Sequence, residues 1–279
     1  MSTSSFTLGP ALLFCPADRP DRFTKAAERS DGVILDLEDA VANRASAREA
    51  LVAHPLDPGR TVVRVNGVAS GELEEDLSAV RAAGYHTVML AKMSTPEDVQ
   101  HLDDLQVLAL CETARGVLAA PEIAAEPSVV GLMWGAEDLM VSLGGTSSRF
   151  SISTGGVAAP YRPVARHARS RVLLAARAFG KAAIDAVHVD IADMIGLRAE
   201  AEDAVASGYT ATACIHPDQV PAVRDAYRPT TEAVARARRV LEEASGAGVH
   251  RVDDRMIDAP MLAQARAVLD RAEQLGDAD

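Results

Sequence analysis

The chain is poor in aromatic residues and in cysteine, and it has no excess of basic charge. Phe, Trp and Tyr make up 4% of its 279 residues, and there are three cysteines. Because their number is odd, their spacing matches no metal motif and each lies in an apolar segment, they indicate buried thiols in a reducing cytoplasm rather than a disulfide framework. The formal net charge of −12 disfavours nucleic-acid binding, because proteins of that class are usually basic.

Long hydrophobic runs are also missing. The segment 1–16 has no basic stretch ahead of an apolar core, so we expect no signal peptide and no membrane span. We therefore expect a cytoplasmic protein that does not interact with membranes. Hydrophobic residues, mostly small ones, still make up 48% of the chain, which suits helices packed closely on a sheet.

Short apolar segments alternate with amphipathic segments along the chain. Most of the apolar segments are hydrophobic on both faces, which is typical of parallel strands covered by helices. The strand candidates are residues 11–16, 32–39, 61–66, 87–92, 107–113, 129–135, 183–190 and 210–217. Eight strands, each followed by a helix, predict an α/β fold of the TIM (β/α)8 barrel type. A doubly wound sheet is the alternative, but the glycine-rich dinucleotide fingerprint is missing after the first strand.

Two segments interrupt this alternation. Residues 143–157 are rich in Gly, Ser and Thr, which predicts a loop or lid over the barrel mouth; an insertion without a role is the alternative. After residue 228, two further helical patterns follow that an eight-stranded barrel does not need. We therefore predict a barrel domain, 1–228, and a C-terminal helical extension, 229–279.

Two carboxylates follow adjacent strand candidates. Glu112 ends the segment VLALCE and Asp138 lies in WGAEDL. Barrel enzymes carry their catalytic groups at the C-terminal ends of the strands, where an uncompensated carboxylate is costly. Two carboxylates with open positions are typical of a Mg²⁺ site, so they predict one here. For Glu112 the alternative is an ion pair with Arg115.

Arg64 is expected to point into the barrel, on the same strand face as Val62 and Asn66. A buried guanidinium needs an anion nearby. A substrate carboxylate, held by the bidentate fork, would supply one; a fixed salt bridge to Asp36 or Glu38 is the alternative. In either case we expect Asp36 and Glu38 to lie behind the site and support it.

Several segments, taken together, resemble those of a known family. ILDLEDAV, VVRVN, CETARGV, WGAEDL and IHPDQV, in this order, are similar to the signature segments of the citrate lyase β-subunit-like branch of the HpcH/HpaI aldolase family. FCPADRPDRFTKA resembles the opening strand and loop of that family. The resemblance covers essentially the whole chain. It implies a Mg²⁺-bearing TIM barrel, a homotrimer or larger assembly, and carbon–carbon bond chemistry between a 2-oxo acid and an acyl thioester enolate.

The resemblance also implies roles for single residues. Glu112 and Asp138 take the places of the metal ligands, and Arg64 the place of the residue that polarises substrate oxygens. The backbone around Gly135 and Ala136 takes the place that receives the substrate carboxylate.

The last part of the chain and the first loop add further candidates. DDRMIDAP resembles the C-terminal segment of stand-alone family members, in which an Asp reaches the active site of a neighbouring subunit; Asp258 occupies that position. Arg255 departs from the small or neutral residue that many relatives have there. Arg19 and Lys25 are candidates for binding the phosphates of CoA, and a solvated helix face is the alternative for both.

The expected function is that of a Mg²⁺-dependent lyase. We expect it to cleave a β-hydroxyacyl-CoA, such as citramalyl-CoA or malyl-CoA, to a 2-oxo acid and acetyl-CoA. One alternative is a citrate lyase β subunit that acts, within a complex, on a citryl thioester of an acyl carrier. A malate-synthase-like or thioesterase activity and a non-catalytic acyl-CoA-binding scaffold are the others.

Overall fold

The computed structural model describes residues 6–150, 159–243, 250–252 and 255–276. The chain forms two compact units, Met1–Val223 and Arg224–Asp279. Within the described residues, no helix is long and apolar enough to cross a membrane.

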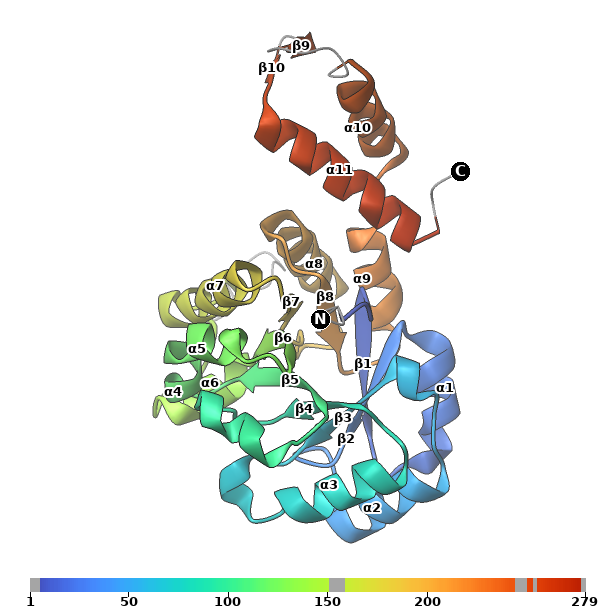
Figure 1. Ribbon diagram of the computed structural model, residues 1–279, viewed down its shortest axis with the longest axis vertical. Coiled ribbons are helices and arrows are strands. Elements are labelled where there is room, and N and C mark those ends of the chain that lie inside the picture. The colour runs from blue at the N-terminus through green and yellow to red at the C-terminus, as the bar shows by residue number, and fades with distance from the viewer. Residues whose placement is uncertain (1–5, 151–158, 244–249, 253–254, 277–279) are drawn as a thin grey trace. The chain divides into compact units, whose positions relative to one another are not determined.

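The first unit is a closed barrel of eight strands with helices around it, as Figure 1 shows. The strands are parallel neighbours in sequence order, and β1 pairs with β8 to close the barrel. Their bounds are β1 Ala11–Pro16, β2 Gly32–Asp36, β3 Thr61–Val65, β4 Thr87–Leu90, β5 Gln106–Cys111, β6 Val129–Trp134, β7 Ala182–Asp185 and β8 Ala211–Cys214. Each overlaps one of the predicted strands, so the TIM-barrel prediction is confirmed.

Helices follow most of the strands. They are α1 Phe23–Arg29, α2 Arg44–Ala53, α3 Leu73–Ala82, α4 Ala114–Leu118, α5 Ala120–Ala125, α6 Ala136–Ser142, α7 Pro163–Ala178, α8 Met194–Ser207 and α9 Gln219–Tyr227. Short 3-10 helices span Pro20–Arg22, Pro58–Arg60, Val68–Ser70 and Pro96–His101. The expectation of a helix after every strand is wrong for β4, which is followed only by the 3-10 helix Pro96–His101. Pro96 and a capping box of Thr95 and Asp98 start that turn, and β5 follows soon after it.

The barrel interior explains where the polar site lies. Side chains alternate along each strand, so Ile34, Val62 and Leu110 fill the interior. The next residue on the same face of each strand is polar: Asp36 after Ile34, Arg64 after Val62, and Glu112 after Leu110. The same alternation that builds the core therefore ends in a ring of charged groups at the barrel mouth.

Residues 151–157 of the predicted lid lie outside the described residues, and its first part, 143–150, is described. Arg149 and Tyr161, on either side of that stretch, form a β-bridge. The guanidinium carbon of Arg149 lies 3.6 Å from the centre of the Tyr161 ring.

The second unit contains the two helices expected from the sequence, α10 Thr231–Glu243 and α11 Ala259–Gln274. They pack on each other through Ala237, Val240 and Ala265, which are small enough for close helix approach. The segment between the helices contains a two-stranded antiparallel pairing, β9 His250–Val252 with β10 Arg255–Ile257, which the sequence pattern did not indicate.

Candidate active site

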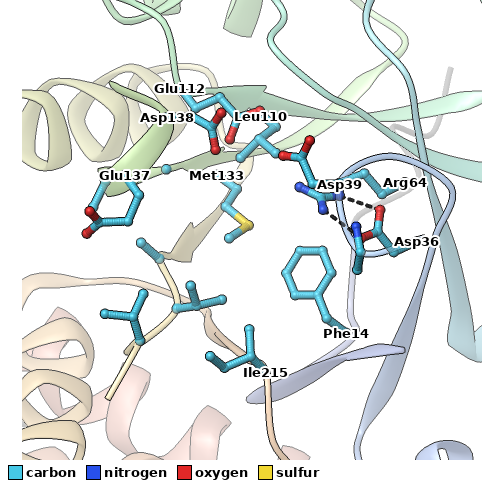
Figure 2. Close-up of a pocket in the computed structure, with 16 residues that line it drawn as sticks. Phe14, Asp36, Asp39, Arg64, Leu110, Glu112, Met133, Glu137, Asp138 and Ile215 are labelled. Carbon is cyan, nitrogen blue, oxygen red and sulfur yellow. Dashed lines mark hydrogen bonds and ion pairs between the residues drawn. The ribbon is translucent and has the colours of Figure 1, made fainter. Parts of the chain in front are cut away.

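A pocket of about 230 Å³ opens at the C-terminal ends of the barrel strands. In Figure 2 the labelled carboxylates and Arg64 surround the upper part of this pocket, and Phe14 and Ile215 lie below them. Six of the residues predicted from the sequence line it: Asp36, Arg64, Glu112, Gly135, Ala136 and Asp138. Glu38 lies directly behind them, whereas Arg19, Lys25 and Asp258 are not among its lining residues.

Arg64 is held by two carboxylates. β2 and β3 place it opposite Asp36 in register, and its Nε and Nη2 donate to the two Asp36 oxygens at 2.7 and 2.6 Å. Its Nη1 lies 3.0 Å from Glu38. Burial alone would lower the pKa of Arg64, but the bonds to Asp36 and the charge of Glu38 hold that pKa above its ordinary value. The salt-bridge alternative is therefore present. The guanidinium also lines the pocket, and its contact with a substrate carboxylate stays a prediction.

Glu112 directly follows β5 and faces the pocket as a buried carboxylate, with 3% of its surface exposed. The backbone N–H of Lys92 donates to its Oε1 at 3.1 Å. A Cβ added at Gly135 would lie only 2.7 Å from Glu112 Oε2, so a glycine is required where β6 passes this carboxylate. Burial and the charge of Asp138 raise the pKa of Glu112 to about 8.

Lys92 is a further member of the site, and the sequence pattern assigned it no role. Its ammonium pairs with Glu38 and lies 3.4 Å from Asp39 and 3.5 Å from Asp138. Its backbone has a φ of 53°, in the left-handed region that non-glycine residues seldom adopt. Lys92 follows β4 as Glu112 follows β5, so the strand-end argument places it at the same edge of the barrel but gives it no role.

Glu112 and Asp138 form a pair that fits a magnesium ion. Asp138 lies in the first turn of α6 and its carboxylate is close enough to Glu112 to raise the pKa of that group. No cluster of three or more His, Cys, Asp or Glu side chains with a metal-binding arrangement occurs in the described residues. A pair of carboxylates suits Mg²⁺, which keeps several water or substrate oxygens in its shell, better than Zn²⁺, which prefers nitrogen and sulfur ligands.

The raised pKa of Glu112 gives a testable pH dependence of stability. Its carboxyl titrates near 8 in the folded protein, against an ordinary value of 4.5. Between these values the folded chain holds a proton that the unfolded chain has lost, so the free energy of unfolding falls as the pH rises. In EDTA, the melting temperature of the wild type should fall relative to Glu112→Gln by on the order of 5 °C between pH 5 and 8. If the difference in melting temperature between the wild type and Glu112→Gln stays constant from pH 5 to 8, burial does not raise the pKa of Glu112.

One of the two CoA-phosphate candidates, Lys25, lines a second hollow of about 360 Å³ that shares Phe14 and Ile215 with the first pocket. Lys25 lines it together with Arg22 and Arg29, and no carboxylate is among the described residues that line it. Arg19 lies outside this hollow and forms an exposed bidentate pair with Asp21.

Asp258 belongs to the second unit. It is exposed, it is the N-cap of α11, and its Oδ1 accepts a hydrogen bond from the backbone N–H of Met261 at 3.1 Å. The residue therefore has a local structural role in its own chain, in addition to any role in catalysis.

Comparison with known proteins places this barrel in a family. Residues 11–217 match the model of the family HpcH/HpaI aldolase/citrate lyase. The chain is 52% identical to a citrate lyase subunit beta-like protein of Mycobacterium tuberculosis, over 95% of this chain and 96% of that protein. It is 33% identical to a (3S)-malyl-CoA thioesterase of Cereibacter sphaeroides, over 95% of both chains. It is 29% identical to the mitochondrial citramalyl-CoA lyase of Homo sapiens, over 92% of this chain and 83% of that protein.

Solved structures agree with this placement. The CitE protein of M. tuberculosis in complex with magnesium, acetoacetate and coenzyme A has a TM-score of 0.89 and 52% identity, over 95% of this chain and 98% of that one. A citrate lyase beta subunit from M. tuberculosis, complexed with oxaloacetate and magnesium, has a TM-score of 0.76 and 54% identity, over 80% and 98%. CitE with magnesium and pyruvate has a TM-score of 0.81 and 48% identity, over 94% and 98%.

Proposed function

This chain belongs to the HpcH/HpaI aldolase/citrate lyase family, and from that premise we propose that it cleaves a β-hydroxyacyl-CoA to a 2-oxo acid and acetyl-CoA. The chain is a carbon–carbon lyase of the aldolase type, and magnesium is its cofactor. The observation that carries the proposed substrate class is the convergence of Glu112, Asp138 and Arg64 in one pocket at the barrel mouth.

Glu112 and Asp138 would hold the magnesium ion. When bound, the ion would polarise the substrate oxygens beside the bond that breaks. Gly135 supports this role, because its missing side chain leaves space for the Glu112 carboxylate. Lys92 keeps Glu112 in place through its backbone N–H and lies within ion-pair distance of Asp138.

Arg64 would stabilise the charge that develops on the substrate. As the hydroxyl proton leaves, the oxygen forms a carbonyl and the carbon–carbon bond breaks, so that its electron pair becomes the enolate of acetyl-CoA. A positive group that is already fixed in position stabilises such developing charge without reorganising. Asp36 and Glu38 supply that fixation, since Asp36 accepts hydrogen bonds from two guanidinium nitrogens and Glu38 forms an ion pair with the third.

The thioester would extend from the pocket to the neighbouring hollow. Lys25, Arg22 and Arg29 give that hollow a positive lining that matches the phosphates of CoA. This arrangement supports a free CoA ester as the substrate, in preference to the acyl-carrier thioester of a citrate lyase complex.

An assay of the purified chain tests this function. Citramalyl-CoA or malyl-CoA should yield a 2-oxo acid and acetyl-CoA in a Mg²⁺-dependent reaction, without release of free thiol. Identity to a (3S)-malyl-CoA thioesterase makes thioester hydrolysis the second candidate. Release of free CoA thiol without formation of acetyl-CoA would favour hydrolysis and contradict the proposed lyase reaction.

We further propose that Asp258 acts in the active site of a neighbouring subunit, where its carboxyl gives a proton to the enolate. The support is the resemblance of DDRMIDAP and the exposure of Asp258 at the start of α11. A homotrimer, which remains a prediction, would bring such a residue to the next barrel if its symmetry is cyclic.

Co-expression of two inactive variants tests this proposal. Asp258→Asn is a suitable variant because Asn caps a helix about as well as Asp, so the stability of α11 is kept. Asp258→Asn and Arg64→Ala should each be nearly inactive alone, and their mixture should regain partial turnover from sites with both wild-type residues. If the hybrids stay inactive although mass measurement shows subunit exchange, then Asp258 either acts in the active site of its own chain or takes no part in the reaction.

A further inference from the structure

We propose that Lys92 is a positioning residue with two effects: its ammonium limits how tightly the site binds a divalent cation, and it keeps the charge of Arg64 available to the substrate. The inference rests on the proposed lyase function and adds a residue to it. Lys92 acts on the metal through Asp138, and on the substrate through Glu38 and Arg64.

The backbone of Lys92 is held in an uncommon conformation by its neighbours. Its φ of 53° lies in the left-handed region, which is costly for a residue with a side chain. On one side, a Cβ added at Gly67 would lie 2.8 Å from the carbonyl oxygen of Ala91. On the other side, a Cβ added at Gly116 would overlap the carbonyl oxygen of Met93. Close packing on both sides fixes this turn, and backbone strain of this kind concentrates at functional sites.

The turn directs the two ends of Lys92 to the two proposed metal ligands. Its backbone N–H donates to Glu112 Oε1 at 3.1 Å, and its ammonium lies 3.5 Å from Asp138 Oδ1. Glu112 and Asp138 both line the pocket and are labelled next to each other in Figure 2. One residue therefore contacts both carboxylates, with a neutral donor on the first and a full positive charge on the second.

The ammonium competes with a divalent cation for the negative charge of Asp138. Glu38 pairs with this ammonium, and Asp39 lies 3.4 Å from it, so the charge is held in place from the other side. Two unit charges of the same sign 4 Å apart repel each other enough, even in water, to change a binding constant about fivefold. A divalent ion bound to Asp138 therefore binds less tightly beside Lys92 than it would without that residue.

The contact with Glu38 extends the effect to Arg64. Glu38 is 5% exposed and lies between the two cations, since it pairs with the Lys92 ammonium through Oε1, and its Oε2 lies 3.0 Å from Arg64 Nη1. Without Lys92, the charge of Glu38 would act on Arg64 alone and offset more of the guanidinium charge. Sharing Glu38 therefore leaves Arg64 better able to stabilise charge that develops on the substrate.

A purely structural ion pair would give a different pattern of effects. If Lys92 only held the carboxylates in place, its removal would weaken Mg²⁺ binding and turnover together. In the proposed role, loss of the ammonium strengthens Mg²⁺ binding and weakens catalysis. The two changes have opposite signs, so a measurement of both distinguishes the roles.

The test compares Lys92→Met with Lys92→Arg in the full chain. Both variants keep the backbone N–H that bonds Glu112, and only Lys92→Met removes the positive charge. Calorimetric titration of metal-free protein with Mg²⁺ should give a dissociation constant at least about fivefold lower for Lys92→Met than for the wild type. Lys92→Arg should stay within about twofold, because it keeps the charge. At saturating Mg²⁺, kcat/KM of Lys92→Met should fall at least about tenfold.

Arg81 provides a control for the change in net charge. Its side chain is 40% exposed against 39% for Lys92, and it pairs with Asp103 at 2.7 Å. It lies on α3 and does not line the pocket. Arg81→Met should leave the Mg²⁺ dissociation constant within about twofold of the wild type, because distant exposed charges are screened by salt. Equal tightening in Arg81→Met and Lys92→Met would assign the effect to net charge and overturn the proposal.

The remaining outcomes are also decisive. If melting curves show that Lys92→Met is unfolded, Lys92→Asn replaces it, because Asn tolerates the left-handed region and has no charge. A folded variant whose Mg²⁺ dissociation constant is unchanged or higher would make Lys92 a structural ion pair. Unchanged kcat/KM would overturn its effect on Arg64. The metal titration needs no turnover: if the wild type cleaves no ester, the lyase function is wrong, while the Mg²⁺ affinities still decide the role of Lys92 at the metal ligands.

Discussion

Glu112→Gln is expected to abolish turnover while leaving the protein folded. Glutamine has nearly the same shape and can still accept the Lys92 N–H bond, but it carries no charge for a divalent cation. Because burial raises the pKa of Glu112 to about 8, removing its charge should not lower stability. Mg²⁺ should raise the melting temperature of the wild type and have no such effect on the variant. Asp138→Asn should behave in the same way.

A buried carboxylate outside the pocket serves as the matched control. Asp185 is 5% exposed at the end of β7, bonded to Arg169 and Trp134, and it does not line the pocket. Asp185→Asn should lower stability but keep the Mg²⁺-dependent shift of the melting temperature. Full activity of the wild type in EDTA would contradict the assignment of the metal ligands.

The sequence was sufficient to predict the barrel, because the barrel strands are buried on both faces. Their apolar runs are therefore continuous, and the runs end close to the observed strands. A helix was expected after β5 and β6, but the positions of α4, α5 and α6 were not predicted, because five to seven residues are too few to show a helical period. Strand pairing across β9 and β10 was missed for a similar reason, since each strand has only three residues.

The candidate site was partly predictable because side chains alternate along the strands that carry it. Alternation along β3 and β5 correctly directs Arg64 and Glu112 toward the barrel interior. Alternation does not give the register between strands, so it left open whether Arg64 pairs with Asp36, Glu38 or a substrate. The position of the Lys92 ammonium depends on a left-handed backbone turn that its sequence does not encode locally. Whether Asp258 reaches another barrel depends on how the subunits assemble. The sequence of one chain does not give that arrangement.

Arg64→Lys is expected to lower kcat/KM by roughly 30- to 1,000-fold, or about 2–4 kcal/mol of transition-state stabilisation. Lysine keeps the charge but cannot donate to both Asp36 oxygens from two nitrogens while a third nitrogen forms an ion pair with Glu38. The substitution should therefore move the charge away from the pocket and also lower stability, because Asp36 is fully buried and loses its partner. Turnover and melting temperature need to be measured together.

Arg48 provides a matched control for the stability effect. Its side chain is 12% exposed against 11% for Arg64, and it bonds Asp76, which is 0% exposed, from Nε at 2.8 Å, with further pairs to Glu72 and Glu75. Arg48 lies on α2 and does not line the pocket. Arg48→Lys should lower the melting temperature about as much as Arg64→Lys but leave kcat/KM within roughly threefold of the wild type, which is below 1 kcal/mol. If the two variants lose activity equally, or if Arg64→Lys keeps wild-type turnover, Arg64 is a structural ion pair and another group must stabilise the oxyanion.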